Sequence, residues 1–119
     1  MGVTTEFFRG ETNSLHVPAG DTVFREGEPG EVMYVVLEGE VEARVKGHLV
    51  ETIGPGGIFG EMALIDHAPR VATITAKTDA KLAPIGEKRF LFMVEQTPHF
   101  SLQIMRLVVD RVRRTVDRL

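Results

Sequence analysis

The stretch PAGDTVFREGEPGEVMYVVLEGEVEARV, residues 18–45, consists of short apolar runs separated by turns that contain glycine or proline. The run from Val32 to Leu37 has the length and the β-branched and aromatic content of a buried strand. From Val41 to Lys46 apolar and charged residues alternate, which is typical of a strand with one buried face. The stretch therefore predicts β-structure built from short strands and tight turns.

Similar runs continue to about Gly86. We expect further strands at Leu15–Val17, Thr22–Arg25, His48–Ile53, Val71–Ala76 and Lys81–Ile85. Short strands at this regular spacing, separated by glycine and proline turns, are typical of an antiparallel barrel or jelly roll. A doubly wound sheet would need helices between successive strands, and the sequence shows no such alternation.

After Gly86 the pattern becomes helical. Glu87–Gln96 predicts one helix, and Thr97-Pro98 predicts the start of another, because threonine is a favourable N-cap and proline is tolerated at the first helical position. A weaker signal for a helical turn lies at Glu6–Arg9. The length of 119 residues suits one domain, 1–119, with its β-structure at about 13–86 and its C-terminal helices at about 87–119.

The last helix carries an apolar stripe with the a/d spacing of a coiled coil. Its members are Leu102, Met105, Val109, Val112, Val116 and Leu119. The stripe can pair with a second copy of the chain, giving a homodimer through the C-terminal helix, or it can hold the helix against its own domain. The spacing alone does not choose between these two arrangements.

Charge is distributed unevenly. Residues 98–119 hold five arginines and two aspartates, a net charge of +3, so the rest of the chain carries −6 of the total of −3. One basic helix end is too narrow for direct nucleic-acid binding, and we interpret it as a solvated helix face.

Composition excludes several kinds of site. The chain has no cysteine, which rules out disulfides, thiolate nucleophiles and zinc sites built on cysteine. Its four histidines show no i, i+2 pair of the kind that cupins use for a metal, and no Ser-His-Asp arrangement can be argued from them. We expect no metal, no cofactor and no enzyme activity. With no apolar run near the roughly 18 residues that span a bilayer and no signal sequence, we expect a cytoplasmic protein without membrane contact.

The residues with chemical potential lie in the segment FGEMALIDHAPRVATITA, Phe59 to Ala76. The glycines before it match neither a dinucleotide-binding fingerprint nor a P-loop. Gly60 ends this glycine-rich turn and a short helix is expected at Glu61–Ile65, so backbone N–H groups and a partial positive charge would face an anion. Arg70 can bind phosphate oxygens bidentately, and an ionised Glu61 can accept hydrogen bonds from a sugar hydroxyl. From spacing alone, a Glu61–Arg70 salt bridge on a barrel rim is an equal alternative.

The pattern FGEMALI at 59–65, followed after four residues by RVAT at 70–73, resembles the phosphate-binding cassette of cyclic nucleotide-binding domains. That family includes regulatory subunits of cyclic-AMP-dependent kinase, bacterial catabolite activator proteins and cyclic-nucleotide-gated channels. The resemblance extends to residues 18–45 and covers about residues 13–119. It implies a mainly β fold, an eight-stranded antiparallel β-roll or jelly roll, with a short cassette helix and two C-terminal helices.

The resemblance also implies a role for each cassette residue. Glu61 would accept a hydrogen bond from the ribose 2′-hydroxyl, and Arg70 would bind the cyclic phosphate. Gly60 and Ala63 would offer backbone N–H groups, Val71 would line the base, and Met62 and Ala72 would form the adjacent wall. Because Val71 has no hydroxyl to bond the amino group of guanine, cyclic AMP is expected in preference to cyclic GMP. Arg111, on the last helix, could stack over a purine, and the alternative is a solvent-exposed arginine.

We therefore expect a sensor that binds a cyclic nucleotide and signals to an effector protein. Phosphate capture would draw the cassette inward, and the two C-terminal helices would move over the ligand. Two alternatives stay open. The chain can be a ligand-free structural β-roll for protein contacts, or the excised sensor domain of a transcription factor or channel.

Overall fold

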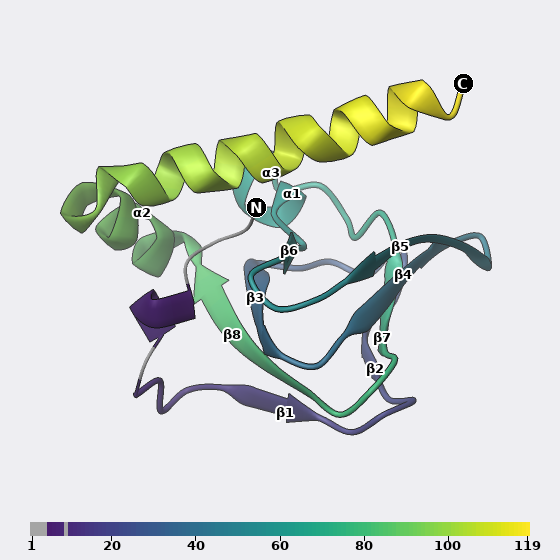
Figure 1. Cartoon of the computed structure of the whole chain (residues 1–119), viewed down its shortest axis with the longest axis horizontal. Helices are drawn as coiled ribbons and strands as arrows, with labels where there is room; N and C mark the ends of the chain where they lie inside the picture. The colour runs from purple at the N-terminus through teal and green to yellow at the C-terminus, as the bar shows by residue number, and fades with distance from the viewer. Residues whose placement is uncertain (1–4, 9) are drawn as a thin grey trace.

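A computed structural model of the chain describes residues 5–8 and 10–119. The strands are β1 (Leu15–Val17), β2 (Thr22–Phe24), β3 (Val32–Glu38), β4 (Val41–Val45), β5 (His48–Ile53), β6 (Ile58–Phe59), β7 (Thr73–Ala76) and β8 (Ala80–Gly86). The helical elements are η1 (Thr5–Phe8), α1 (Met62–Ile65), α2 (Glu87–Gln96) and α3 (Pro98–Asp117). The strands form two antiparallel sheets in the orders β1-β8-β3-β6 and β2-β7-β4-β5, and α3 runs along one side of them (Figure 1).

The expected eight-stranded roll with a short helix and two C-terminal helices is confirmed. Strand β6 is not among the strands expected from local pattern, because its two residues lie between glycines and are too few to show an alternation. They pair with Tyr34 and Val35 of β3 and are buried. The strand expected at Val71–Ala76 begins only at Thr73, so Arg70 precedes it in an irregular segment. Of the helical turn expected at Glu6–Arg9, the structure shows η1, while Arg9 lies outside the described residues.

Strand β3 is buried on both faces, which explains why its sequence is continuously apolar. Val36 packs into the core cluster inside the roll, and Tyr34 packs against that cluster. Met33 and Val35 point the other way, into a second cluster that includes Phe100 of α3. Because successive side chains of a strand face opposite sides, a strand buried on both faces shows no polar alternation.

The second cluster seats the helices on the roll. Phe100 is fully buried and meets the rings of Phe7 and Phe90 edge-on, and Ile104 is buried one turn further along α3. Thr97 occupies the N-cap position of α3 as expected, but its hydroxyl makes no capping hydrogen bond, and its backbone carbonyl accepts from the Phe100 N–H instead. In the part of the chain that the structure describes, no helix is both long and apolar enough to cross a bilayer.

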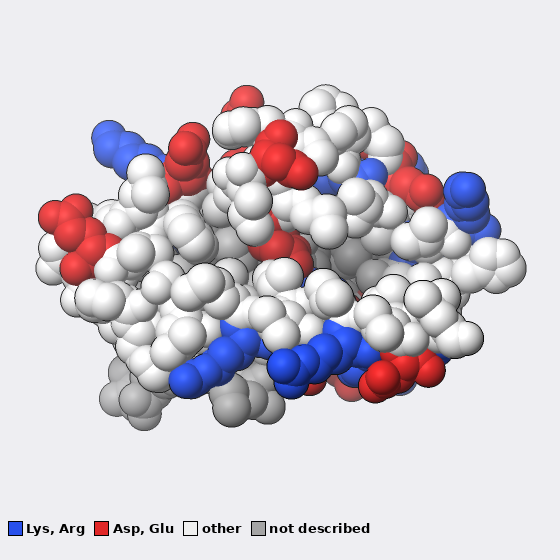
Figure 2. Space-filling model, turned by 90° about the horizontal axis from the view of Figure 1, so that it is seen from above, with Lys and Arg blue, Asp and Glu red and all other residues white. Residues whose placement is uncertain are grey.

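Helix α3 is laid against its own domain, as one of the two alternatives expects, but not through its a/d stripe. All six stripe residues are exposed, from 37% at Leu102 to 58% at Val116, with Leu119 fully accessible. The helix packs instead through Phe100, Ile104 and their neighbours on another face. Figure 2 looks onto the side on which α3 lies and shows a surface of mostly uncharged residues, with basic side chains in a row along one edge.

Candidate functional site

A cavity of about 150 Å³ lies between the sheet β2-β7-β4-β5, the segment 59–63, the segment 68–72 and α3. All of the site residues expected from the sequence line it: Gly60, Glu61, Met62, Ala63, Arg70, Val71, Ala72 and Arg111. The remaining wall is mainly apolar and comes from the strands. The fold thus brings the cassette and one residue of α3 to a single cavity.

Arg70 is a buried cation, with only 7% of its surface exposed. Its Nη1 donates to the carbonyl oxygens of Val32, at 2.9 Å, and Gly60, at 3.3 Å. Its guanidinium carbon lies 3.9 Å from the centre of the Phe24 ring, a cation–π contact. Its Nε is buried and has no hydrogen-bond partner among the described residues. A buried donor without a partner is costly, so this geometry favours an anion beside the guanidinium.

Desolvation by burial lowers the pKa of the Arg70 guanidinium, and the electrostatic influence of Tyr34 and Glu28 opposes that shift. An arginine nevertheless keeps its charge at neutral pH. Arg70 is therefore a permanent positive charge in a mainly apolar cavity, which is the requirement for holding a phosphate in low dielectric.

Glu61 is equally buried, at 7% exposure, but its partner is not Arg70. Its Oε1 accepts from Arg111 Nη1 at 2.5 Å. The alternative of a Glu61–Arg70 salt bridge on an exposed rim is therefore wrong, since each buried charge has its own surroundings. Glu61 is the N-cap residue of α1, and the helix itself begins at Met62 rather than at the expected position 61.

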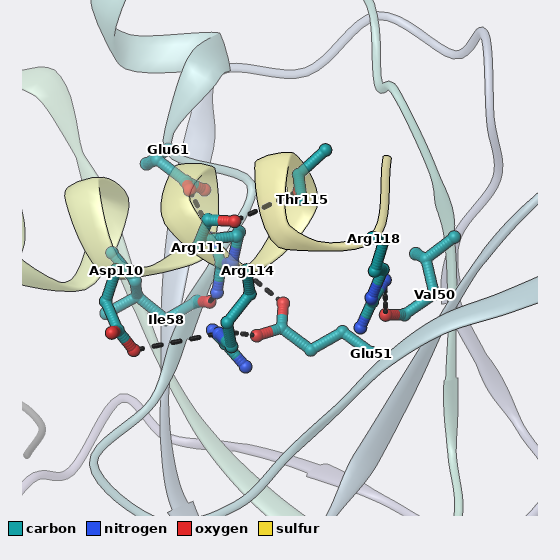
Figure 3. A network of polar contacts seen from close by, with 9 residues as sticks. All are labelled: Val50, Glu51, Ile58, Glu61, Asp110, Arg111, Arg114, Thr115 and Arg118. Atoms are coloured by element: carbon teal, nitrogen blue, oxygen red, sulfur yellow. Dashed lines mark hydrogen bonds and ion pairs between the residues drawn. The ribbon is translucent and has the colours of Figure 1, made fainter.

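Arg111 is held by three groups of the roll (Figure 3). Besides Glu61, its Nη2 donates to the Ile58 carbonyl at 2.6 Å, and its Nε lies 2.7 Å from Glu51 Oε2, an ion pair without the angle of a hydrogen bond. Glu51 also binds Arg114 Nη2 at 2.7 Å, and Arg118 Nη1 donates to the Val50 carbonyl at 3.1 Å. We call these contacts of α3 with β5, Ile58 and Glu61 the arginine clasp.

The arginine clasp corrects one interpretation of the sequence and adds contacts to another. Arg111 is not a solvent-exposed arginine, because its side chain is 28% exposed and is bound on several sides. The basic end of α3 is largely solvated as expected, since Arg106, Arg113, Arg114 and Arg118 are exposed, but Arg111, Arg114 and Arg118 also contact the roll. Three of the five arginines that made this helix conspicuous in the sequence thus contribute contacts that attach it to the roll.

The backbone N–H groups of the cassette are not all free, as they would be at the N-terminus of a longer helix. Helix α1 is a single turn, and the Ala63 N–H already donates to the Gly60 carbonyl at 3.2 Å. Gly60 has a left-handed backbone, with φ of 78°, and a Cβ there would come within 2.7 Å of Arg70 Nη1. Glycine is thus required for two reasons at this position. Met62 and Val71 line the cavity but remain about half exposed, at 47% and 54%.

Two residues that line the cavity and contact its arginines are missing from the expectations. Phe24, which stacks on Arg70, shows in the sequence only as an aromatic residue of a short strand. Glu51 lies in β5 and meets Arg111 and Arg114 only because α3 crosses that strand. No local pattern contains a signal for either contact.

Residues 14–97 match the family model described as the cyclic nucleotide-binding domain. This chain belongs to the cyclic nucleotide-binding domain family. It is 31% identical over 107 residues to a CRP-like cAMP-activated global transcriptional regulator of Mycobacterium tuberculosis, which covers 86% of this chain and 48% of that protein. It is 40% identical over 88 residues to the cAMP-dependent protein kinase regulatory subunit of Emericella nidulans, covering 70% of this chain and 21% of that protein.

A solved structure agrees with this membership. The crystal structure of a cyclic nucleotide-binding domain from Methylobacillus flagellatus superposes with a TM-score of 0.78 at 26% identity, over 89% of this chain and 65% of that one. The cyclic nucleotide-binding domain described here spans less than half the length of the two curated relatives, and those relatives are named as a regulator and a regulatory subunit.

Replacing Glu51 with glutamine tests the arginine clasp. The variant keeps the shape of the side chain but removes the charge that Arg111 and Arg114 share. We expect the amide hydrogens of residues 110–117 to exchange with solvent about fivefold faster, since partly exposed ion pairs contribute on the order of 1 kcal/mol. Hydrogen exchange followed by mass spectrometry measures this.

The matched control is Glu42→Gln, which removes a charge paired with Arg44 on the neighbouring strand β4. Unchanged exchange at 110–117 in Glu51→Gln, or equal acceleration in the control, contradicts the clasp.

Proposed function

We propose that this domain is a cytoplasmic sensor that binds cyclic AMP in the cavity, catalyses nothing and acts through an effector protein rather than on nucleic acid. The observation that carries the proposal is Arg70, a buried cation with an unpartnered Nε in a mainly apolar cavity. Membership of the family and the names of the two curated relatives, both of which refer to cAMP, support this choice of ligand.

In this proposal different residues of the cavity bind the phosphate, the ribose and the base of the ligand. The cyclic phosphate binds Arg70 beside Gly60, where the lack of a side chain leaves room for the Arg70 guanidinium. The backbone N–H groups at Gly60 and Ala63 assist, and the Ala63 N–H does so by sharing or exchanging its bond to the Gly60 carbonyl. The ribose 2′-hydroxyl donates to Glu61. The base lies against Val71 and its neighbours, with Met62 and Ala72 as adjacent wall. A valine that cannot bond the guanine amino group favours cyclic AMP over cyclic GMP.

Calorimetry with the two cyclic nucleotides tests the ligand assignment. We expect tighter binding of cyclic AMP, and we expect Arg70→Ala to weaken it by about 2–4 kcal/mol, because a charge-assisted contact to the phosphate is lost. Arg44→Ala is the control, since Arg44 is an arginine of β4 that does not line the cavity. Thermal unfolding verifies that both variants are folded. Unchanged affinity in folded Arg70→Ala refutes the phosphate role.

We further propose that ligand binding is coupled to α3 through Glu61. A ribose hydroxyl and Arg111 Nη1 would both use the Glu61 carboxylate, so the ligand and the arginine clasp compete for it or share it. If ligand binding changes the contact between Glu61 and Arg111, then loss of that contact must change the affinity for the ligand, because coupling between two sites is reciprocal. Helix α2, which joins the roll to α3, is the proposed hinge, and Arg111 is the proposed residue that covers the base.

The coupling predicts a change in α3 on adding cyclic AMP. We expect hydrogen exchange at residues 107–117 to change in the unmodified protein and to stay constant in Arg111→Ala, because the link between Glu61 and α3 is gone. Arg113→Ala is the matched control, since Arg113 is an exposed arginine of the same helix that does not line the cavity. The same ligand response in Arg111→Ala as in the control would show that coupling does not run through Arg111.

The exposed a/d stripe supports a homodimer through α3 as a second part of the proposal. The stripe follows heptad spacing, all of its members are exposed, and the helix binds the roll through a different face. A second copy of the chain would bury the same stripe from both sides.

The dimer predicts the effect of a charge on the stripe. We expect Val112→Glu to halve the solution mass measured by light scattering. Leu91→Glu, an equally exposed apolar position on α2 outside the stripe, is expected to leave the mass unchanged. A monomeric unmodified protein, or a dimer that survives Val112→Glu, contradicts this arrangement.

A further inference from the structure

We propose that Gly30, in the turn between β2 and β3, is a positioning residue that sets the orientation of the Arg70 guanidinium. The inference rests on the proposed function in one respect, namely that Arg70 binds the phosphate. Gly30 lies forty residues before Arg70 and belongs to no part of the cassette.

The turn first holds the backbone of Arg70. The Gly27 N–H donates to the Arg70 carbonyl at 2.8 Å, and the Arg70 N–H donates to the Glu28 carbonyl at 2.8 Å. Both backbone polar groups of Arg70 are therefore bonded to this one turn, which determines where its side chain starts. Arg70 precedes β7 and has no place in a strand ladder of its own.

The same turn then meets the guanidinium. A Cβ at Gly30 would lie 2.2 Å from Nε, 2.3 Å from Cζ and 2.5 Å from Nη2 of Arg70. These separations are far below van der Waals contact, so the guanidinium occupies the space that any side chain at position 30 would take. It also stacks on Phe24, at 3.9 Å. The bare Cα of Gly30 and the Phe24 ring thus both limit the positions open to the guanidinium.

Backbone conformation does not explain the glycine. Gly30 has no left-handed φ, unlike Gly27 in the same turn, whose φ is 86°. Any residue can adopt such a backbone, so glycine at position 30 is required for space and not for the turn. The three atoms nearest to that space all belong to the Arg70 guanidinium group.

The consequence concerns the phosphate site. Nη1 is directed by the Val32 and Gly60 carbonyls, while the unpartnered Nε lies beside Gly30. A methyl group at position 30 must push the guanidinium away from this arrangement, and bidentate binding depends on the orientation of the planar donor group. Gly30 then acts on the ligand through Arg70 without touching the ligand itself.

A double-mutant cycle between Gly30→Ala and Arg70→Ala tests this positioning role. In the unmodified protein we expect Gly30→Ala to lower the midpoint of urea unfolding and to weaken cyclic AMP binding about tenfold, the effect of losing one well-aligned hydrogen bond to a charged group. In the Arg70→Ala background we expect Gly30→Ala to change neither quantity, because the methyl group then has room. Gly54→Ala is the matched control, since Gly54 has no left-handed φ and a Cβ there would meet no atom within 4 Å.

Unfolding and cyclic AMP binding together distinguish a failure of the positioning role from a failure of the proposed phosphate site. The unfolding cycle needs no ligand, so equal losses of stability with and without Arg70 overturn the packing of Gly30 against the guanidinium. Weaker cyclic AMP binding in Arg70→Ala but not in Gly30→Ala overturns the positioning role. A third outcome is that neither variant changes binding while the unfolding cycle is non-additive. Gly30 then packs against Arg70, but the proposed phosphate site is wrong, and a role of Gly30 in ligand binding is overturned with it.

Discussion

The structure depends on one buried guanidinium. Arg70 is buried, and no carboxylate forms an ion pair with it among the described residues. This is unusual, because charged side chains are seldom buried without an ion-pair partner. Its surroundings are arranged to make this tolerable. Two carbonyls accept from Nη1, an aromatic ring covers one face, and the turn between β2 and β3 bonds its backbone. Arg70 has more hydrogen-bond donors than acceptors around it, and an anionic ligand can supply the missing acceptors.

The second constraint is the way α3 is attached. Near its start the helix is fixed by apolar contacts of Phe100 and Ile104, whereas towards its end it is fixed by the arginine clasp. Salt does not screen apolar packing, whereas it weakens ion pairs at a partly exposed surface, and a charged ligand can compete with those ion pairs. The two ends of α3 are therefore attached by different kinds of contact, apolar packing beside α2 and ion pairs above the cavity, and the coupling proposed above needs the second kind to change. An element of this kind can have two arrangements, which coupling between a ligand and a distant partner requires.

Local pattern was sufficient for much of the fold. The apolar run of β3, the alternation in β4 and the helical segments after Gly86 are each signalled by residues close in sequence, and the roll is confirmed with eight strands. Short elements were not predictable in this way. Strand β6 exists because Ile58 and Phe59 pair with β3 far from them in the chain, and α1 is shorter than its helix-forming residues suggest. The a/d stripe correctly identified a face of α3, but spacing could not reveal that this face points outward.

The amino-acid sequence by itself determined that Gly60, Glu61 and Arg70 lie in one short segment, and the resemblance of that segment to the family's cassette made them the candidate site residues. Tertiary structure alone decided which charges meet. Glu61 pairs with Arg111 rather than Arg70, Glu51 joins them from β5, and Gly30 makes room for the Arg70 side chain. The physical reason is that side-chain chemistry is a property of each residue, whereas an ion pair or a steric fit depends on distances between residues that are far apart along the chain and that only folding brings together.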